Sequence, residues 1–226
     1  MNAEEYCELV EQKDLLQKQR RRTVRVVEDN SPLISLKDSG FNLVFEPSIK
    51  EDYRYLVREA AFEKVGRISK RLDDEEKALI IRSVWRSFSH QRLLWQNRVD
   101  LLQRENPEIH QNQIRAMAEY FIAPETKSMH ATGGAVDALI FDLKADRVMD
   151  FGTNDGLNIT LSRRCYPLHP DITPQAKRNR ELLIGLFEEE GLVCDIKEYW
   201  HFDFGNIIWA IQKNEAHARY GIIESF

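Results

Sequence analysis

The chain has 226 residues, a length that suits one large domain or one domain with an added arm. Its net charge of −5, from 32 Lys and Arg against 37 Asp and Glu, gives no sign of a surface for nucleic acids or anionic membranes. No apolar run approaches the roughly 20 residues of a membrane span, and the polar start has no apolar signal core, so we expect a cytoplasmic protein.

The first 40 residues differ in character from the rest. Residues 3–22 are charged and free of Gly and Pro, which predicts an exposed helix. The basic run Gln19-Arg-Arg-Arg22 closes this helix, where positive charge suits the negative end of the helix dipole; this role is favoured over nucleic-acid binding. Turn clusters follow at 30–33 and 38–40. We therefore expect an N-terminal helical arm or extension over 1–40 and the main domain over 41–226.

Helices and strands then alternate along the chain. Residues 52–70 have the apolar spacing of a helix, and 77–85 form an apolar run typical of a buried strand. Ser89 can cap a helix that ends near Glu105, before Asn106-Pro107. A second helix is expected over about 108–122.

The second half adds more strands. The stretch 128–150 has strand character on both sides of a Gly-Gly pair, and 151–172 predicts a long loop. Thr173-Pro174 begins a helix, and 192–212 predicts two strands joined by a turn at Gly205-Asn206. We expect an α+β fold: a single domain with a small, mostly antiparallel sheet flanked by helices. The three cysteines are odd in number and widely spaced, which favours buried or reduced thiols.

Two short segments hold side chains of the kinds that a catalytic zinc site uses. The first runs from Ser128 to Asp137 and contains His130, and the second is Glu198-Tyr-Trp-His201. Together they offer two imidazoles, one carboxylate ligand and one spare carboxylate. A catalytic zinc site needs three protein ligands, an open position for water, and a base that uses this water.

The geometry of a β-strand decides whether the side chains of these two segments can reach one metal ion. Asp137 shares a strand face with apolar residues, and a carboxylate there is costly unless it is paired or bound to a metal. On an ideal strand Glu198 and His201 would point to opposite faces. Both reach one metal only if the chain bends between them or if Glu198 precedes the regular strand, and we predict such a bend.

The roles follow from this inventory. We expect His130, Asp137 and His201 to bind one zinc ion per chain, and Glu198 to take a proton from the attacking water and pass it to the leaving amine. Each residue alone has an ordinary alternative, because a His among aromatic residues is more often a packed core residue. The combination is far more specific than its members.

Two further side chains are candidates for binding the substrate. Arg86 ends a buried strand and can hold a developing oxyanion or a substrate carboxylate, although an Arg there can equally pair with a surface acid. Gln91 and Arg92, one turn into the next helix, are expected to support it. Asp155, in a Gly-rich loop, either binds a substrate ammonium group or is an ordinary turn residue.

The chain resembles the zinc D-alanyl-D-alanine dipeptidases of the vancomycin-resistance type, in a superfamily with D,D-carboxypeptidases and the hedgehog signalling domain. The family pattern Ser-x-His-x-x-Gly-x-Ala-x-Asp is met over 128–137, and its Glu-Trp-Trp-His is met by Glu198-Tyr-Trp-His201. Trp85-Arg-Ser87 corresponds to the family's Tyr-Arg-Pro, and the loop from Phe151 resembles its Met-Gly-Thr loop one residue short. The resemblance covers roughly 45–220, and the first 40 residues find no clear match.

The resemblance implies a hedgehog-like peptidase fold, with His130, Asp137 and His201 as zinc ligands, Glu198 as general base and Arg86 as transition-state stabiliser. Ser128 and Asp155 are expected to bind the substrate. The implied reaction is hydrolysis of a D-amino-acid dipeptide such as D-Ala-D-Ala by a monomer or homodimer without nucleic-acid or membrane partners. The alternatives are a peptidoglycan D,D- or L,D-carboxypeptidase or endolysin, and a non-catalytic zinc-binding module.

Overall fold

The computed structural model describes residues 1–119, 122–152 and 163–224. The helices in these ranges are α1 (Ala3–Arg20), α2 (Glu59–Asp73), α3 (Phe88–Glu105), α4 (Gln111–Glu119), α6 (Pro174–Glu189) and α7 (Ile207–Lys213), with single 3-10 turns η1 (Glu125–Lys127), η2 (Met129–Thr132) and η3 (Arg163–Cys165). The strands are β1 (Arg25–Val26), β2 (Leu33–Ser35), β3 (Leu43–Phe45), β4 (Leu56–Arg58), β5 (Lys77–Ser83), β6 (Ala135–Asp142), β7 (Arg147–Val148), β8 (Val193–Cys194), β9 (His201–Asp203) and β10 (His217–Ala218).

The central sheet has the strand order β3-β5-β6-β9-β8, and β7 pairs with the end of β6. Only the β3–β5 pair in this sheet is parallel; the other pairs are antiparallel. Two small ladders lie outside it, a parallel β1–β10 pair and an antiparallel β2–β4 pair. The expected α+β fold with a small, mostly antiparallel sheet is therefore confirmed.

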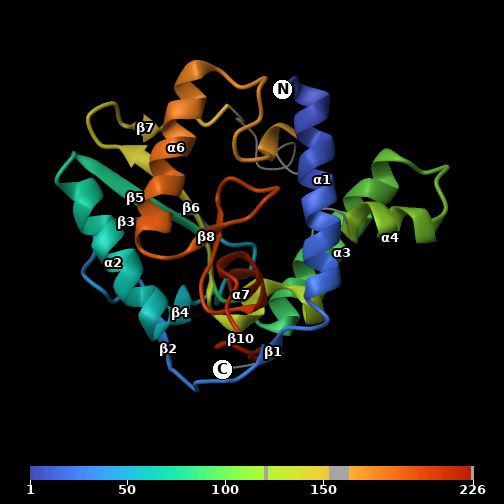
Figure 1. Cartoon of the computed structure of the whole chain (residues 1–226), viewed down its shortest axis with the longest axis horizontal. Coiled ribbons are helices and arrows are strands. Elements are labelled where there is room, and N and C mark those ends of the chain that lie inside the picture. Colours follow the sequence, from blue (N-terminus) through green and yellow to red (C-terminus); the bar gives the residue numbers. More distant parts are fainter. Residues whose placement is uncertain (120–121, 153–162, 225–226) are drawn as a thin grey trace.

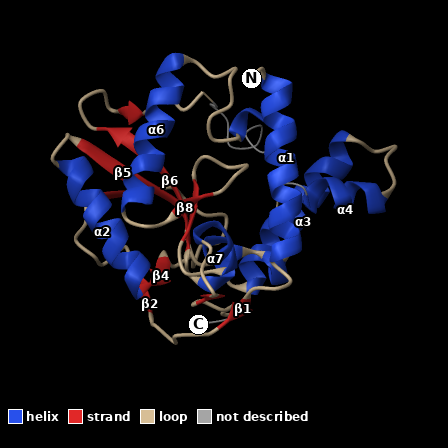
Figure 2. Ribbon diagram, in the orientation of Figure 1, coloured by secondary structure: helices blue, strands red, loops and turns tan. Residues whose placement is uncertain are grey.

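Helices surround this sheet, and its strands β5, β6 and β8 lie at the centre of the molecule (Figure 2). Helix α2 packs on β5 and contacts α6, while α3 and α4 project on the opposite side (Figure 1). The main core is built from residues that are completely or nearly completely buried between these elements: Val65, Ile68, Leu79, Ile81, Val136, Ala138, Ile140, Leu183, Phe187 and Phe202. The core therefore holds the middle of β5 and β6 rigid, and these two strands lead into the polar centre described below.

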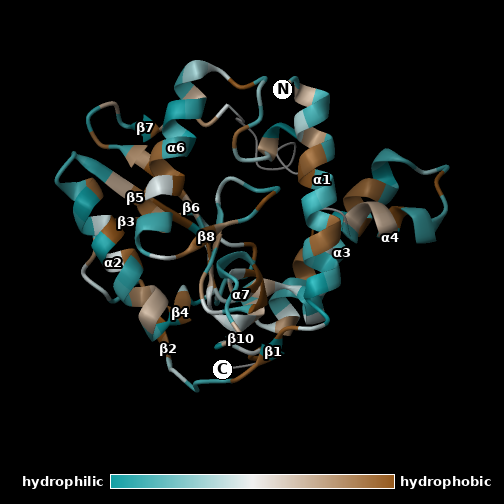
Figure 3. Cartoon of the chain, in the orientation of Figure 1, coloured by the Kyte–Doolittle hydropathy of each residue, from teal (hydrophilic) through white to brown (hydrophobic). Residues whose placement is uncertain are grey.

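Helix α1 is less exposed than its sequence predicts. Its ribbon alternates between hydrophilic and hydrophobic colours in Figure 3, and one face is buried. Cys7 and Val10 pack against Tyr166, and Asp14 forms an ion pair with Lys197 at 3.2 Å. Long-range contacts therefore bury a helix that looks solvent-exposed when only its charge is considered.

Other elements differ from their expected form. The helix expected over 52–70 begins only at Glu59, because Leu56–Arg58 pairs with β2 as strand β4. The stretch before Gly133 is the 3-10 turn η2 rather than a strand, and Ser87, not Ser89, caps α3. In each case a pairing or cap outside the local pattern decided the boundary.

The hairpin expected at Gly205-Asn206 is wrong. Asn206 instead caps α7, because its side-chain oxygen accepts hydrogen bonds from the backbone N–H groups of Ile208 and Trp209 at 3.0 and 3.1 Å. Strand β9 thus runs into a helix, and a cap residue was mistaken for a turn residue.

All three cysteines are buried and free, as expected. Within the described ranges, no helix combines the length and the apolar character needed to cross a bilayer.

Candidate metal centre

Strand register brings Asp137 and His201 together. The two residues are direct partners in the antiparallel β6–β9 pair, and Ser83 lies opposite Asp137 on the other neighbour, β5. His201 Nδ1 lies 2.8 Å from Asp137 Oδ1. Residues 64 positions apart in the chain therefore meet because two strands pair in this register.

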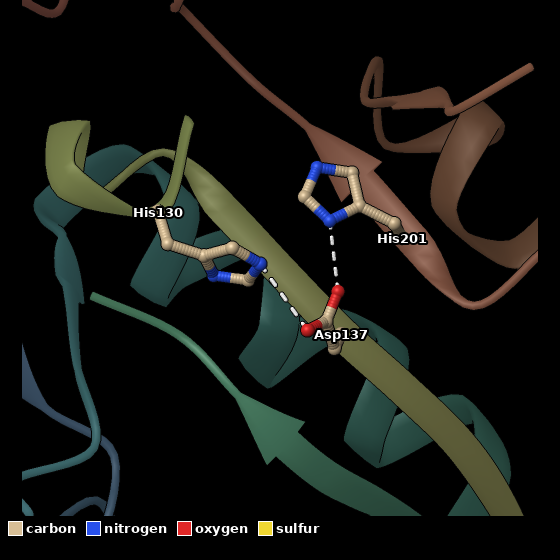
Figure 4. Close-up of side chains that lie close together, drawn as sticks. All are labelled: His130, Asp137 and His201. Atoms are coloured by element: carbon tan, nitrogen blue, oxygen red, sulfur yellow. Dashed lines mark hydrogen bonds and ion pairs between the residues drawn. The ribbon is translucent and has the colours of Figure 1, made fainter. Parts of the chain in front are cut away.

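His130 reaches the same carboxylate from η2. Gly133 ends this 3-10 turn with φ +74°, a left-handed conformation that favours glycine, and the chain then enters β6. His130 Nε2 lies 3.2 Å from Asp137 Oδ2. Figure 4 shows both rings directed at the Asp137 carboxylate, His130 from the left and His201 from above. The three ligand atoms lie within 4.8 Å of one another, so the predicted ligands do converge.

Each histidine is oriented by a hydrogen bond on its far side. The Nδ1 of His130 lies 2.8 Å from the backbone carbonyl oxygen of Val84, which leaves Nε2 for the centre. The Nε2 of His201 lies 3.2 Å from Asp203 Oδ1, which leaves Nδ1 for the centre. Carbonyl and carboxylate partners of this kind set the tautomer and ring orientation of metal-binding histidines.

Asp203 is a further carboxylate at the cluster that the sequence motifs do not predict. It is fully buried, and its Oδ1 also accepts a hydrogen bond from Asn206 Nδ2 at 2.5 Å. The signal was present, because residues two apart on a strand share a face and His201-Phe-Asp203 has this spacing. Nothing local, however, distinguishes such an aspartate from one at a solvated strand end.

The protonation of the ligands follows from burial and neighbouring charge. Burial, with the nearby Arg86 charge, lowers the pKa of His130 to about 4. Burial alone would also lower the pKa of His201, but the Asp203 carboxylate and the hydrogen bonds to Asp137 and Asp203 outweigh it and raise that pKa well above the usual value. Burial would raise the pKa of Asp137, yet the two histidines hold it well below its usual range. The centre is thus an anion between one neutral and one protonated imidazole.

This donor set fits zinc. Two imidazole nitrogens and one carboxylate are ligands that zinc accepts, and three protein ligands leave a position open for water in a tetrahedral catalytic site. The buried Asp203 carboxylate completes the carboxylate–histidine arrangement common around zinc. The buried centre, with the carboxylates of Asp137 and Asp203, therefore suits a divalent cation.

Glu198 precedes strand β9 rather than lying on it. The backbone N–H of His201 donates to the Glu198 carbonyl at 3.1 Å, which closes a turn, and β9 begins at His201. The predicted bend is confirmed. Burial and the neighbouring Asp195 raise the pKa of Glu198 to about 7, and the charges of His201 and Asp137 also act on it. Glu198 therefore lies in the turn directly before the ligand His201, with a pKa suited to proton transfer near neutral pH.

Arg86 lies against the ligand cluster, not at the surface. Its Nη2 donates to Asp137 Oδ2 at 2.9 Å, its Nε donates to Ser83 Oγ at 2.7 Å, and its Nη1 lies 3.3 Å from Gln91 Oε1. Gln91 thus supports Arg86 as expected. Arg92 does not, because it pairs with Glu125 on the surface.

Of the two remaining predicted site residues, the structure describes Ser128 but not Asp155. Ser128 is 3% exposed and directly precedes η2, two residues before His130. Asp155 lies outside the described residues. The substrate-binding roles of both stay predictions.

Two curated relatives are similar to part of the chain. A D-alanyl-D-alanine dipeptidase of Synechocystis is 32% identical and covers 45% of this chain, and one of Escherichia coli K12 is 31% identical and covers 38%. The matched regions span 46% and 42% of these relatives, less than half of their length.

Solved structures with a similar fold include the zinc-bound vancomycin-resistance D,D-pentapeptidase VanY and the LD-carboxypeptidase LdcB. VanY superposes with a TM-score of 0.48 at 14% identity and covers 84% of this chain and 87% of its own. LdcB gives 0.47 at 17% identity and covers 82% and 75%.

The model of the family described as D-Ala-D-Ala dipeptidase matches residues 42–219, which include every residue of the ligand cluster, Glu198 and Arg86. Because this match extends over most of the chain, the protein belongs to the D-Ala-D-Ala dipeptidase family.

Proposed function

We propose that this protein is a zinc-dependent peptidase that hydrolyses a D-amino-acid dipeptide, with D-alanyl-D-alanine as its substrate. The convergence of His130, Asp137 and His201, with both rings oriented from behind, is the observation that carries this proposal. Membership of the D-Ala-D-Ala dipeptidase family supports the substrate class. One zinc ion per chain, held by these three residues, would polarise the scissile carbonyl and acidify a water molecule.

Glu198 performs the proton transfers in this proposal. Its carboxylate takes a proton from the attacking water and, once protonated, donates it to the amine that leaves when the peptide bond breaks. The pKa of about 7 serves both steps, because the group gains and loses a proton easily near neutral pH. Burial that raises this pKa therefore supports the assigned role.

Arg86 stabilises negative charge in this proposal. Its guanidinium already lies beside the Asp137 carboxylate, so it places a positive charge within reach of an oxygen that becomes negative during attack. Ser83 and Gln91 accept its other hydrogen bonds and fix its orientation.

We assign Ser128 and Asp155 to substrate binding, the latter to the ammonium group of the dipeptide.

A hydrolysis screen of D- and L-dipeptides with and without a chelator tests the function. We expect D-Ala-D-Ala to be cleaved and a chelator to abolish cleavage. Hydrolysis of a stem pentapeptide instead of the free dipeptide would show a D,D-carboxypeptidase. Zinc found by metal analysis without hydrolysis of either peptide would show a non-catalytic zinc-binding module.

Glu198→Ala tests the mechanism. Loss of a general base reduces turnover by about 10²–10⁴-fold, whereas the three ligands remain, so zinc content stays at one per chain. The measurements are kcat for D-Ala-D-Ala and metal content by atomic spectroscopy. If this variant hydrolysed D-Ala-D-Ala as fast as wild type, the role assigned to Glu198 would be wrong.

A further inference from the structure

Arg180 on helix α6 is a completely buried cation. Among the residues that the structure describes, no carboxylate forms an ion pair with it, and its Nη2 has no hydrogen-bond partner. Burial lowers the pKa of its guanidinium. A buried charge without a counter-ion is unfavourable, and an apolar side chain of similar volume often stabilises a fold better. The reason for an arginine here must therefore come from its specific contacts.

The guanidinium holds two separate chain segments through their backbone carbonyls. Its Nε donates to Phe151 O at 2.8 Å. Its Nη1 lies 2.8, 2.9 and 3.3 Å from the carbonyl oxygens of Arg164, Tyr166 and Pro167. A planar fork of donors can join several acceptors in this way, which a lysine ammonium or a neutral side chain cannot. Arg180 therefore fixes 164–167 relative to Phe151 and α6.

Arg180 also contacts the turn that carries Glu198. Its guanidinium carbon lies 3.9 Å from the centre of the Tyr199 ring, and the Phe151 ring stacks on Tyr199 at 5.5 Å. The backbone N–H of Tyr199 donates to Cys165 O at 3.1 Å, within the segment that Arg180 holds. Tyr199 is thus fixed by its ring and by its backbone, and Glu198 is joined to it by one peptide bond.

A neighbouring residue strengthens the same junction. Asn179 Nδ2 donates to Asp150 O at 2.6 Å, and Gln175 donates to the Asn179 side-chain oxygen at 2.8 Å. Successive positions of α6 therefore hold successive carbonyls, those of Asp150 and Phe151. The segment beside the Glu198 turn is tied to a helix whose other residues, such as Leu183 and Phe187, lie in the main core.

We propose that Arg180 is a positioning residue for the reaction: through the carbonyls of 164–167 and the Tyr199 ring, it keeps the Glu198 carboxylate directed at the metal-ligand cluster. The proposal rests on the proposed function, in which Glu198 is the base. Arg180 is not itself a catalytic residue, because it contacts backbone carbonyls and an aromatic face rather than the metal-ligand cluster.

The expected effect of removing this contact is on turnover. Arg180→Met keeps a long, unbranched side chain but leaves the carbonyls without their donors, so the Tyr199 turn loosens. A displacement of about 1 Å at a reacting group can reduce the rate about 10²-fold. We expect kcat for D-Ala-D-Ala to fall about 10- to 100-fold, with KM and zinc content little changed, because no ligand is touched.

The experiment compares Arg180→Met and Arg180→Lys with Arg98→Met in the whole 226-residue chain. Arg98 is another buried arginine, 5% exposed, on α3 instead of α6, and controls for the general loss of a buried guanidinium. Kinetics give kcat and KM. Hydrogen exchange of the zinc-free proteins, read at the Tyr199 amide, reports the turn without depending on activity or metal. Arg180→Lys keeps the charge but loses the fork, so it is expected to lie between wild type and Arg180→Met, and it serves if Arg180→Met does not fold.

The outcomes separate the two proposals. Faster exchange at Tyr199 with a loss of kcat in the Arg180 variants, and neither in Arg98→Met, supports the inference. Unchanged exchange and kcat in the Arg180 variants, or equal losses in Arg98→Met, overturns it. If wild type cleaves no D-dipeptide, the proposed function fails. The exchange data then still decide whether Arg180 holds the Glu198 turn.

Discussion

At the scale of single residues, the ligand cluster is governed by the two carboxylates that face His201. Asp137 lies 2.8 Å from its Nδ1 and Asp203 lies 3.2 Å from its Nε2, and all three groups are buried. In the metal-free protein this arrangement favours the imidazolium. A metal ion needs the neutral ring, so it must displace a proton from His201.

The affinity for zinc should therefore depend on pH. The pKa of His130 is lowered to about 4 and that of His201 is raised well above 6.5. Between these values His130 is already neutral and His201 is protonated. Zinc binding then releases about one proton from the ligands, so the dissociation constant should rise about tenfold for each unit that the pH falls from about 6.5 to 5. Competition with a chelating dye at several pH values measures it.

Asp203→Asn supplies the control for this titration. Without the Asp203 charge, the pKa of His201 moves toward its usual value, so the pH dependence should be shallower than in wild type above about pH 6.5, where the ring is then largely neutral. Loss of such an outer partner should also weaken zinc affinity about 10- to 100-fold. A flat profile in wild type would contradict the assignment of His201 as a protonated ligand.

At the scale of elements, the cluster depends on how η2, β6 and β9 join. Gly133 allows the left-handed end of η2, and Gly134 lies directly against the backbone of Phe204, which donates to the Gly134 carbonyl at 2.8 Å. Gly134 thus makes room for the chain after β9. The pair thus sets how closely His130 and His201 approach.

Gly134→Ala should disturb this junction. An added Cβ would overlap the carbonyl oxygen of Phe204, which is backbone and cannot swing away. We expect a loss of about 1–3 kcal/mol in the free energy of unfolding together with weaker zinc binding, because β6 and β9 must separate. Urea unfolding and zinc titration measure the two effects.

Gly185→Ala is the matched control for this change. Gly185 lies inside α6, and an added Cβ there meets nothing within 4 Å. Alanine should therefore raise stability by about 0.5–1 kcal/mol through helix propensity and leave zinc affinity unchanged. If both variants changed the free energy of unfolding and the zinc affinity to the same extent, the close packing assigned to Gly134 would be contradicted.

At the scale of the whole molecule, the cluster joins two segments that lie far apart in the chain. His130 comes from η2, Asp137 from β6 and His201 from β9, and Asp203 is held by the cap of α7. A metal ion bound to all three ligands exists only in the folded chain. Binding of the metal is therefore coupled to global stability.

Removal of the metal should lower the melting temperature. At a zinc concentration of about 100 times Kd, binding stabilises the folded state by about 2.7 kcal/mol. For a chain of this size the loss corresponds to roughly 5–10 °C in Tm. Calorimetry with and without a chelator measures the shift, and His201→Ala should show none. A wild-type Tm insensitive to chelator would show that no metal joins these segments.

The sequence by itself determined the chemical inventory and the local elements with strong signals. Residue type and spacing predict the roles of His130, Asp137, Glu198 and His201. Strand alternation, together with the hypothesis that Glu198 and His201 act at one metal, predicts the bend before His201. Helix α6 followed from its Thr173 cap and Pro174, and strand β5 from its apolar run. These features are encoded by neighbouring residues, so no partner from elsewhere in the chain was needed.

The tertiary structure alone decided which distant groups meet. Strand register and helix docking determine three such contacts: the pairing of Asp203 with His201, the hydrogen bond from Arg86 to Asp137, and the hydrogen bonds from Arg180 to the carbonyls of 164–167. The burial of α1 and the cap role of Asn206 are of the same kind. Buried polar groups must find partners, and the partner is set by the fold rather than by adjacent residues. Motif spacing therefore predicts the ligands, whereas their orientation and protonation depend on the whole fold.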